Sequence, residues 1–315
     1  MNIGILGTGF GAYHAQLLSQ MEQTGDISVF GRNRTKLDEL ESRLGVRTTE
    51  SIDEILQDES IGLIDLCLPS AVHTEYAIQA LKAGKHVFCE TPVCLSYEDI
   101  QKLNEAEQQY GRKIMVNQFI KFEPSYRYLY DSVQAGTFGR LLSVSFHRET
   151  PPMWGDLGLG RITTDLMIHE LDMVCWLLGP TEASFVWGRT GSNPHQALVR
   201  AQFAGPDSYA EVLVSSQMPE SYPFTVGYTA HFEHGKLQYR ESEDRHGHAD
   251  SLLMEYTRSG AQQKILPKLN SYEESLRYAL EHLNDPSPSL LSLSSALQAM
   301  SLGLQLRDRL ELNSN

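Results

Sequence analysis

The sequence predicts two domains of different fold class. Residues 1–118 are expected to form an α/β domain with a doubly wound, parallel sheet, because short apolar runs alternate there with helical segments. Residues 119–315 are expected to form an α+β domain with an open, mostly antiparallel sheet, because strand-like runs follow one another with short turns. A chain of 315 residues is long enough to give each domain its own core.

The first domain shows readable strand and helix boundaries. Ser51 and Ser96 each precede an acidic residue by three positions, which predicts two capped helix starts. Gly84 predicts the end of a helix over residues 74–83. The expected strands are Ile3–Leu6, Ile27–Phe30, Leu63–Leu68, His86–Cys89 and Ile114–Val116.

The second domain is expected to place four helices beside its strands. One predicted helix runs over residues 162–178 and ends at Gly179-Pro180, and the polar stretch 244–250 is expected to be a loop. The other expected helices are 124–134, 272–283 and 291–310. The expected strands are 141–148, 184–189, 197–203, 209–215, 224–232 and 236–239.

Composition and charge exclude several classes of partner. The net charge of −14 argues against binding to nucleic acid or to an anionic membrane surface. No apolar run is long enough for a membrane span, and the N-terminal residues predict a strand, so we expect a cytoplasmic protein without a signal peptide. Neither the four cysteines nor the histidines show ligand spacing, so no metal is expected.

A glycine-rich turn follows the first strand and opens a helix. A dinucleotide pyrophosphate needs close backbone and the free N–H groups of a helix N-terminus, which such a turn provides. Ala12 stands at the position of the third glycine, which normally allows the helix to pack against the strand. The predicted cofactor contacts in this turn are Gly7, Thr8, Gly9, Phe10, Gly11 and Ala12.

The end of the second strand predicts a preference for NADP over NAD. A carboxylate that accepts the ribose hydroxyls of NAD is expected there, but the sequence reads Gly31-Arg32-Asn33-Arg34. A guanidinium binds a 2′-phosphate, so Arg32 is the expected main contact, with Asn33 beside it and Arg34 as a further candidate. The alternative is that Arg32 only stacks on the adenine and that NAD is used.

Five further stretches give the chain a family resemblance. They read LPSAVH from Leu68, AGKHVFCETP from Ala83, FEPSY from Phe122, GTFG from Gly136 and DLMIHELD from Asp165. In this order they resemble the glucose–fructose oxidoreductase and inositol dehydrogenase family (Gfo/Idh/MocA), over essentially the whole chain. The resemblance implies an α/β Rossmann domain over residues 1–118, followed by an α+β domain with an open, mostly antiparallel sheet. It also implies a small polyhydroxylated or keto substrate, such as a sugar or cyclitol, and a homodimer or homotetramer formed through the second-domain sheet.

The resemblance also implies where the nicotinamide half of the cofactor binds. It places Pro69, Ser70 and His73 beside that half, with Glu90 on its ribose. Pro92 completes the expected contacts, and the Thr91-Pro92 bond is expected to be cis.

Asp165 and His169 are the candidate proton-transfer residues. They are four residues apart, so a continuous helix would place them on one face. Histidine can carry a proton near neutral pH, and a nearby carboxylate can orient it and raise its pKa. The spacing alone favours a helix-capping or surface Asp and a hydrogen-bonded core His, whereas the resemblance implies the catalytic roles.

Thr91 occupies the position at which the family usually has lysine. Loss of a cation beside a developing alkoxide is expected to cost several kcal/mol of transition-state stabilisation, by comparison with ~2.7–4 kcal/mol for one oxyanion-hole donor. His169 can then act alone with Thr91 and water, Lys121 can supply the charge, or the protein can bind ligands without turnover. Trp154 and Arg161 are further candidates for substrate contact.

The sequence therefore predicts a nicotinamide-dependent oxidoreductase that acts on a sugar-like or cyclitol-like hydroxyl or ketone. The alternatives are a non-catalytic NADP-binding sensor or partner-binding protein, and a lyase or glycosidase that forms a transient ketone.

Overall fold

The computed structural model describes residues 1–285 and 289–314. Internal contacts divide the chain into two units, the first made of Met1–Phe119 with Asn270–Leu297 and the second of Ile120–Leu269 with the residues from Gln298 onward. A single boundary at residue 118 does not describe this division. The chain returns to unit 1 at Asn270, and the helix that follows packs against the first helix.

Unit 1 contains the predicted parallel sheet, with six strands in the order β3-β2-β1-β4-β5-β6. Its central strands are fully buried, as sheets covered on both faces require. The short edge strand β3 was not predicted, because its three residues are polar and partly exposed. The strands of unit 1 are β1 (Asn2–Leu6), β2 (Ile27–Phe30), β3 (Arg47–Thr49), β4 (Ile61–Leu66), β5 (His86–Cys89) and β6 (Ile114–Val116).

The helices of unit 1 begin and end largely where local signals predict. Ser51 and Ser96 each accept a hydrogen bond from the backbone N–H three residues later, which confirms both predicted caps. The helices are α1 (Phe10–Leu18), α2 (Arg34–Leu44), α3 (Ile52–Gln57), α4 (His73–Lys82), α5 (Tyr97–Tyr110) and α9 (Ser271–His282).

The order of the strands decides where a ligand binds to unit 1. The chain passes from β1 outward to β2 and β3, then crosses to β4 on the other side of β1. Ligands of doubly wound sheets bind at such a reversal, outside the carboxyl ends of the strands. The turns after β1, β2, β4 and β5 therefore form the expected binding edge.

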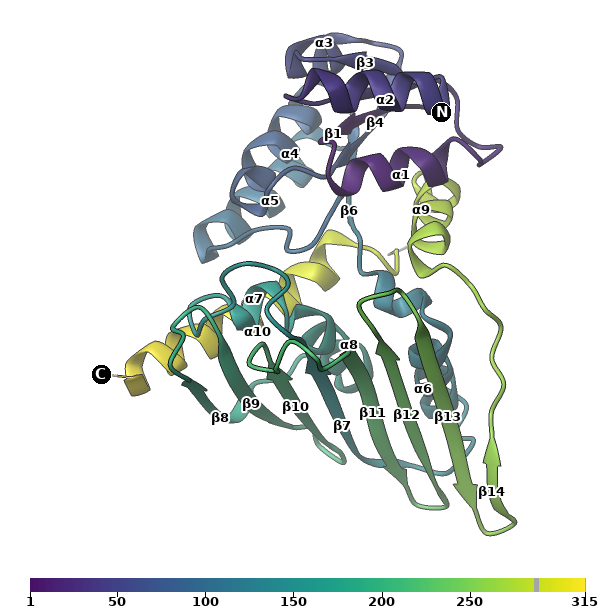
Figure 1. The fold of residues 1–315 in the computed structure, drawn as a ribbon, viewed down its shortest axis with the longest axis vertical. Coiled ribbons are helices and arrows are strands. Elements are labelled where there is room, and N and C mark those ends of the chain that lie inside the picture. Colours follow the sequence, from purple (N-terminus) through teal and green to yellow (C-terminus); the bar gives the residue numbers. More distant parts are fainter. Residues whose placement is uncertain (286–288, 315) are drawn as a thin grey trace. The chain divides into compact units, whose positions relative to one another are not determined.

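Unit 2 is built on an eight-stranded sheet in the order β14-β13-β12-β11-β7-β10-β9-β8 (Figure 1). All its neighbouring strands are antiparallel except β7 and β10, which confirms a mostly antiparallel sheet. The strands are β7 (Leu141–Glu149), β8 (Ala183–Thr190), β9 (Ala197–Ala204), β10 (Tyr209–Ser215), β11 (Phe224–Phe232), β12 (Gly235–Glu243), β13 (Ala249–Thr257) and β14 (Gly260–Gln263). The predicted loop ends earlier than expected, since β13 begins at Ala249.

The helix predicted over residues 162–178 is two helices, α7 (Ile162–Asp165) and α8 (Ile168–Leu178). The carbonyl of Ile162 accepts hydrogen bonds from both Leu166 N–H and Met167 N–H. The second bond spans five residues instead of four, so the regular α-helical hydrogen-bond pattern is interrupted here. The prediction that Asp165 and His169 lie on one face of a continuous helix is therefore wrong.

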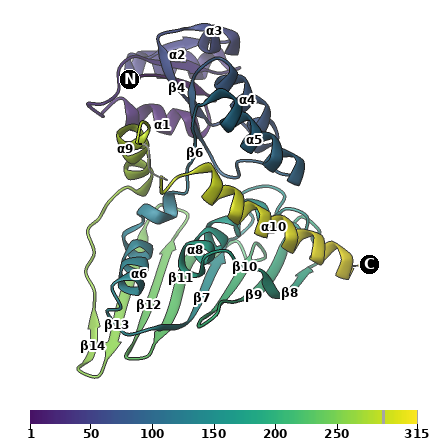
Figure 2. The same cartoon turned by 180° about the vertical axis from the view of Figure 1, so that it is seen from behind.

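One face of the unit 2 sheet is covered by helices, and the other is open. Helices α6 (Pro124–Gln134) and α8 lie over the same face (Figure 2). The uncovered face of β8, β9 and β10 carries a hollow of about 490 Å³. The last helix is α10 (Leu293–Ser314), and no helix in the described part of the chain has the length and apolarity of a membrane span.

Candidate functional site

The turn between β1 and α1 has the shape that a pyrophosphate requires. Gly7 has φ +122°, and a Cβ there would lie 2.6 Å from the carbonyl oxygen of Cys67, so only glycine fits. A Cβ on Gly9 would meet no protein atom within 4 Å, so it would project into open space. Helix α1 starts after Gly9 without a side-chain cap, which leaves backbone N–H groups for an anion.

Close packing of α1 against β1 depends on Gly11 rather than on Ala12. A Cβ on Gly11 would lie 2.8 Å from Ile5 Cγ2 and 3.3 Å from Cys67 Cβ. Ala12 is half-buried and lines a hollow on the side of α1 that faces α2. The role of the packing glycine, which the sequence pattern gave to position 12, therefore belongs to position 11.

A pocket of about 470 Å³ joins the glycine turn to the ends of β2 and β4. Its volume lies within the usual range for ligand pockets. Its cationic side chains are Arg32 and Lys36, and none of its lining residues is acidic. The lining residues are Gly7, Thr8, Gly9, Phe30, Gly31, Arg32, Asn33, Lys36, Cys67, Leu68 and Pro69.

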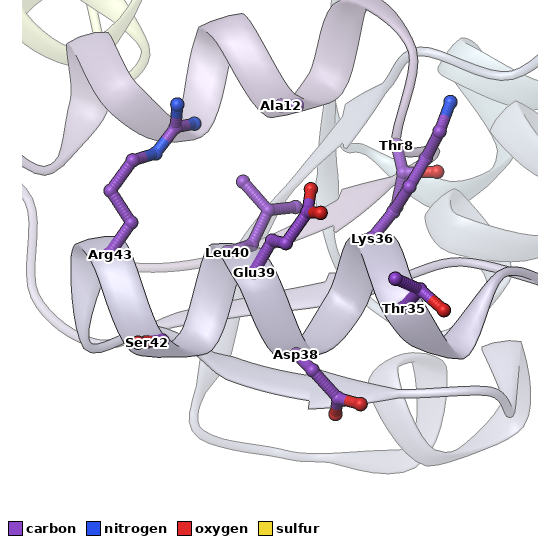
Figure 3. A pocket seen from close by; sticks show the side chains of 9 residues that line it. All are labelled: Thr8, Ala12, Thr35, Lys36, Asp38, Glu39, Leu40, Ser42 and Arg43. Carbon is purple, nitrogen blue, oxygen red and sulfur yellow. The ribbon is translucent and has the colours of Figure 1, made fainter.

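Lys36 is a candidate phosphate contact that the sequence reasoning missed. Asn33 caps α2 by accepting from Lys36 N–H at 3.2 Å, which places Lys36 in the first turn of the helix. Figure 3 shows the Lys36 side chain on the side of α2 that faces α1, close to Thr8, whereas Asp38 points away. Recognition of Asn33 as a helix cap would have pointed to Lys36, because first-turn side chains stand beside the preceding loop.

Arg34 makes contacts that differ from those of Lys36. Its guanidinium lies 2.6 Å from Asp38 and 3.6 Å from Glu41, on the exposed surface of α2. It does not line the pocket that contains Arg32.

The segments after β4 and β5 are tied together by His73. Its Nδ1 lies 2.9 Å from the carbonyl oxygen of Pro92, and its Nε2 lies 2.6 Å from that of Leu68. Burial lowers the pKa of His73. The Thr91-Pro92 bond is cis, as expected, and Ser70 begins a short 3-10 turn beside Pro69. Cofactor contact by Pro69, Ser70, His73 and Pro92 stays a prediction.

Glu90 stands at the carboxyl end of β5, where a ligand of the sheet is expected. Its Oε1 accepts from Asn117 Nδ2 at 2.5 Å, and its Oε2 accepts from Thr91 N–H at 3.3 Å. Its side chain is 14% exposed. Glu90 Oε1 also lies 3.1 Å from Nε2 of the buried His14.

In unit 2, Asp165 contacts Arg161 and Thr164. Asp165 Oδ2 accepts from Arg161 Nε at 2.8 Å, and Asp165 Oδ1 accepts from Thr164 Oγ1 at 2.8 Å. Arg161 was expected to bind substrate, but its guanidinium is paired within its own turn. Asp165 and Arg161 therefore form a local ion pair.

His169 lies on α8, where it is half-buried and has a cation nearby. Burial, and then the positive charge of Arg148, lower the pKa of His169 well below its ordinary value of 6.5. The net direction is thus opposite to the rise that a nearby carboxylate would cause. An imidazole with a low pKa is neutral at pH 7 and can accept a proton.

Arg148 forms a buried pair with Glu170, the residue after His169. Arg148 Nε lies 2.8 Å and 2.9 Å from the two carboxylate oxygens, and the guanidinium lies 5.5 Å from the ring centroid of Phe224. Burial raises the pKa of Glu170, although Arg148 opposes that effect.

Lys121 and Trp154 occupy different settings in unit 2. Lys121 is 1% exposed, and its Nζ lies 3.1 Å from Asp172 Oδ1. Burial raises the pKa of Asp172 to about 6, with Lys121 acting in the opposite direction. Trp154 is half-exposed and packs edge-on against Phe224, with ring centroids 5.2 Å apart.

The described residues contain one group with metal-ligand spacing, made of His14, Asp65 and Cys67 in unit 1. Its ligand atoms lie within 4.8 Å of one another. Burial, and then the charge of Asp65, raise the pKa of Cys67, so the thiol stays protonated. A protonated thiol is a poor metal ligand, and the group is better described as a buried hydrogen-bonded cluster.

Comparison with known proteins identifies the first unit. Residues 1–118 match the family model GFO_IDH_MocA, described as an oxidoreductase family with an NAD-binding Rossmann fold. Myo-inositol 2-dehydrogenase of Thermotoga maritima is 27% identical over 184 residues, which cover 57% of this chain and 55% of that enzyme. The chain thus spans about half the length of the curated relatives it matches.

Solved structures with the same fold cover nearly the whole chain. UDP-N-acetylglucosamine 3-dehydrogenase of Acidithiobacillus ferrooxidans has a TM-score of 0.80 and 21% identity, and the match covers 99% of this chain and 98% of that one. A 3-ketoreductase of Actinomadura kijaniata, in complex with NADP, has a TM-score of 0.80 and 18% identity, with 98% and 97% covered. At these identities the likeness shows the fold alone.

These matches confirm the cofactor class predicted for residues 1–118, a nicotinamide dinucleotide. The choice of NADP over NAD stays a prediction. Residues 1–118 are similar to the NAD-binding Rossmann domain of the Gfo/Idh/MocA oxidoreductase family.

Proposed function

We propose that the protein is an NADP-preferring oxidoreductase that interconverts a hydroxyl and a ketone on a sugar-like or cyclitol-like molecule. The observation that carries this proposal is the glycine turn, where Gly7 admits no side chain and the Cβ direction of Gly9 is open. The bound dinucleotide supplies a hydride acceptor or donor. Relatives that act on myo-inositol and on a UDP-sugar support the substrate class.

We propose that the residues of this chain bind the cofactor and move the proton. Backbone N–H groups of the β1–α1 turn hold the pyrophosphate, while Arg32 and Lys36 hold a 2′-phosphate. His169 takes the hydroxyl proton during oxidation. Its low pKa keeps the imidazole neutral at pH 7, which is the protonation state that a proton acceptor needs.

The pairing of Lys121 supports a mechanism in which His169 acts without a lysine. The Lys121 ammonium is buried against Asp172, so its charge is already balanced within unit 2. We therefore assign assistance at the substrate oxygen to Thr91 and water. Thr91 also motivates a second candidate function, a sensor that binds NADP without turnover.

Turnover of a substrate panel separates the two candidates. The purified protein is incubated with NADP or NAD and with cyclitols, UDP-sugars and free sugars, and the absorbance of reduced nicotinamide is followed. The reverse panel uses NADPH with keto-sugars. Formation or loss of that absorbance supports the oxidoreductase, whereas tight cofactor binding without turnover on either panel supports the sensor.

Removal of the two pocket cations is expected to weaken NADPH binding selectively. Each charge-assisted hydrogen bond contributes about 1.5–3 kcal/mol, so the double variant Arg32→Ala/Lys36→Ala is expected to raise the Kd of NADPH by at least about 100-fold. The Kd of NADH is expected to change by less than about threefold, because NADH carries no 2′-phosphate. Both constants are measured by calorimetric titration.

Arg34→Ala is the matched control for this pair. Arg34 is paired with Asp38 and Glu41 on the surface of α2, so its removal is expected to leave the NADPH affinity within about twofold. An equal loss of NADPH affinity in the Arg34 variant, or an equal loss of NADH affinity in the double variant, would contradict the assignment.

We also propose a homo-oligomer formed through the open face of the unit 2 sheet. Phe185 and Trp187 are each 43% exposed on β8, and the hollow that they line with Leu198 and Leu213 faces away from the helices. Exposed aromatic side chains gathered on one sheet face are typical of protein interfaces.

A further inference from the structure

A buried histidine lies directly behind the glycine turn, between two carboxylates of unit 1. His14 follows the turn on α1, and its side chain is fully buried. Its Nδ1 lies 2.9 Å and 3.2 Å from the two carboxylate oxygens of Asp65 on β4. Its Nε2 lies 3.1 Å from Glu90 Oε1, at the end of β5. The histidine therefore links the carboxyl ends of two neighbouring strands.

The surroundings of His14 favour its charged form. Burial alone lowers the pKa of His14, but Asp65 and then Cys67 oppose this and raise that pKa well above its ordinary value. An imidazolium has an N–H on each ring nitrogen, and here each nitrogen faces a carboxylate. Nε2 has no well-aligned acceptor among the described residues, so its contact with Glu90 is one between charges rather than an ideal hydrogen bond.

The chain of contacts continues beyond Glu90 and is buried everywhere except at Glu90. Asn117 donates to Glu90 Oε1 and accepts from Ser275 Oγ at 2.6 Å. Asp65, His14, Asn117 and Ser275 are at most 1% exposed, whereas Glu90 is 14% exposed. Glu90 is therefore the member of this cluster that can reach a ligand.

The topology shows which part of a dinucleotide Glu90 would meet. The adenosine side is the pocket formed by the ends of β1, β2 and β4, with Arg32. Glu90 follows β5, on the opposite side of β4 from that pocket. A dinucleotide that crosses the strand-order reversal from β2 toward β5 brings its nicotinamide ribose to this end of the sheet.

We propose that His14 is a positioning residue for the cofactor, which fixes the Glu90 carboxylate so that it accepts hydrogen bonds from the nicotinamide ribose hydroxyls. This inference rests on the proposed function and deepens it. Asp65 contacts Nδ1 of the imidazole and fixes the orientation of the ring. Nε2 on the opposite side of the ring then contacts Oε1 of Glu90. The contacts of Asn117 and Thr91 with Glu90 complete the orientation.

The test compares a whole cofactor with a fragment that lacks the nicotinamide ribose. NADPH and 2′,5′-ADP are titrated against the full-length wild type and against His14→Gln. If wild type binds NADH more tightly, NADH and 5′-ADP replace them. His14→Gln is expected to raise the Kd of NADPH by about 10- to 100-fold, the effect of one charge-assisted hydrogen bond. The Kd of 2′,5′-ADP is expected to change by less than about twofold.

Three further variants complete this test. Glu90→Gln should reproduce the selective loss even if His14→Gln fails to fold, and His14→Gln added to Glu90→Gln should cause little further loss of NADPH affinity. His282→Gln, on α9 of the same unit, is the matched control and should leave both affinities unchanged.

The outcomes separate the inference from the proposed function. Unchanged NADPH affinity in His14→Gln, equal weakening of both ligands, or additive losses in the double variant would each overturn the positioning role. A wild type that binds neither dinucleotide would instead overturn the proposed function itself.

Discussion

Replacement of His169 by alanine is expected to lower kcat by about 10²–10⁴-fold, the usual contribution of one acid–base group. The neutral imidazole can accept the hydroxyl proton as hydride leaves the same carbon, and alanine offers no group with a suitable pKa. The NADPH affinity is expected to stay within about twofold, because the proposed phosphate contacts, the glycine turn with Arg32 and Lys36, do not include His169. Initial rates on the best substrate of the panel and a cofactor titration measure both quantities.

The pH profile gives this prediction a sharper signature. Burial and Arg148 lower the pKa of His169 well below 6.5, so the group stays neutral as the pH falls through 6.5. The kcat/KM for oxidation is therefore expected to stay level through pH 6.5 and to fall only at a lower pH. An inflection at the ordinary histidine pKa would contradict the lowered pKa of His169, and a His169→Ala enzyme with the wild-type rate would exclude His169 as the proton acceptor.

Replacement of Arg148 by methionine is expected to lower the free energy of unfolding of unit 2 by about 3–5 kcal/mol. Glu170 is fully buried, and Arg148 contacts both its carboxylate oxygens. Without the guanidinium, the carboxylate must either stay charged in an apolar setting or take up a proton against the solution pH. Either outcome costs free energy that the native pair avoids.

Urea unfolding followed by tryptophan fluorescence measures this cost in the appropriate unit. The three tryptophans are Trp154, Trp176 and Trp187, and all three belong to unit 2. The double variant Arg148→Met/Glu170→Gln is the control, because it removes both charges and is expected to recover most of the lost stability. A single variant as stable as wild type, or a double variant less stable than the single, would show that the pair does not act as described.

Much of the fold could be predicted because its signals are local. Apolar runs predicted the observed bounds of β2, β5 and β6. Pro124 at the start and Gly136 after the end predicted the bounds of α6. The break between α7 and α8 could not be predicted in this way. It depends on one carbonyl, that of Ile162, accepting two hydrogen bonds, and the apolar pattern continues through the break.

The candidate site shows the same division between local and distant information. The glycine turn and Arg32 could be identified because their spacing and chain context carry the signal. The cluster of His14, Asp65 and Glu90 could not, because its members are far apart in the sequence and meet only where α1, β4 and β5 are packed together. The lowered pKa of His169 likewise comes from burial and then from Arg148, which lies on another element.

The return of residues 270–297 to unit 1 has a consequence for biosynthesis. Helix α9 brings Tyr272 to within 5.1 Å of the Phe10 ring, and Ser275 completes the contacts of Asn117. About 150 residues separate Phe119 from Asn270, which corresponds to roughly 8–30 s of translation at typical rates. Residues 1–119 therefore leave the ribosome before the unit to which they belong is complete. Helix α9 is added only after the strands of unit 2 have been synthesised.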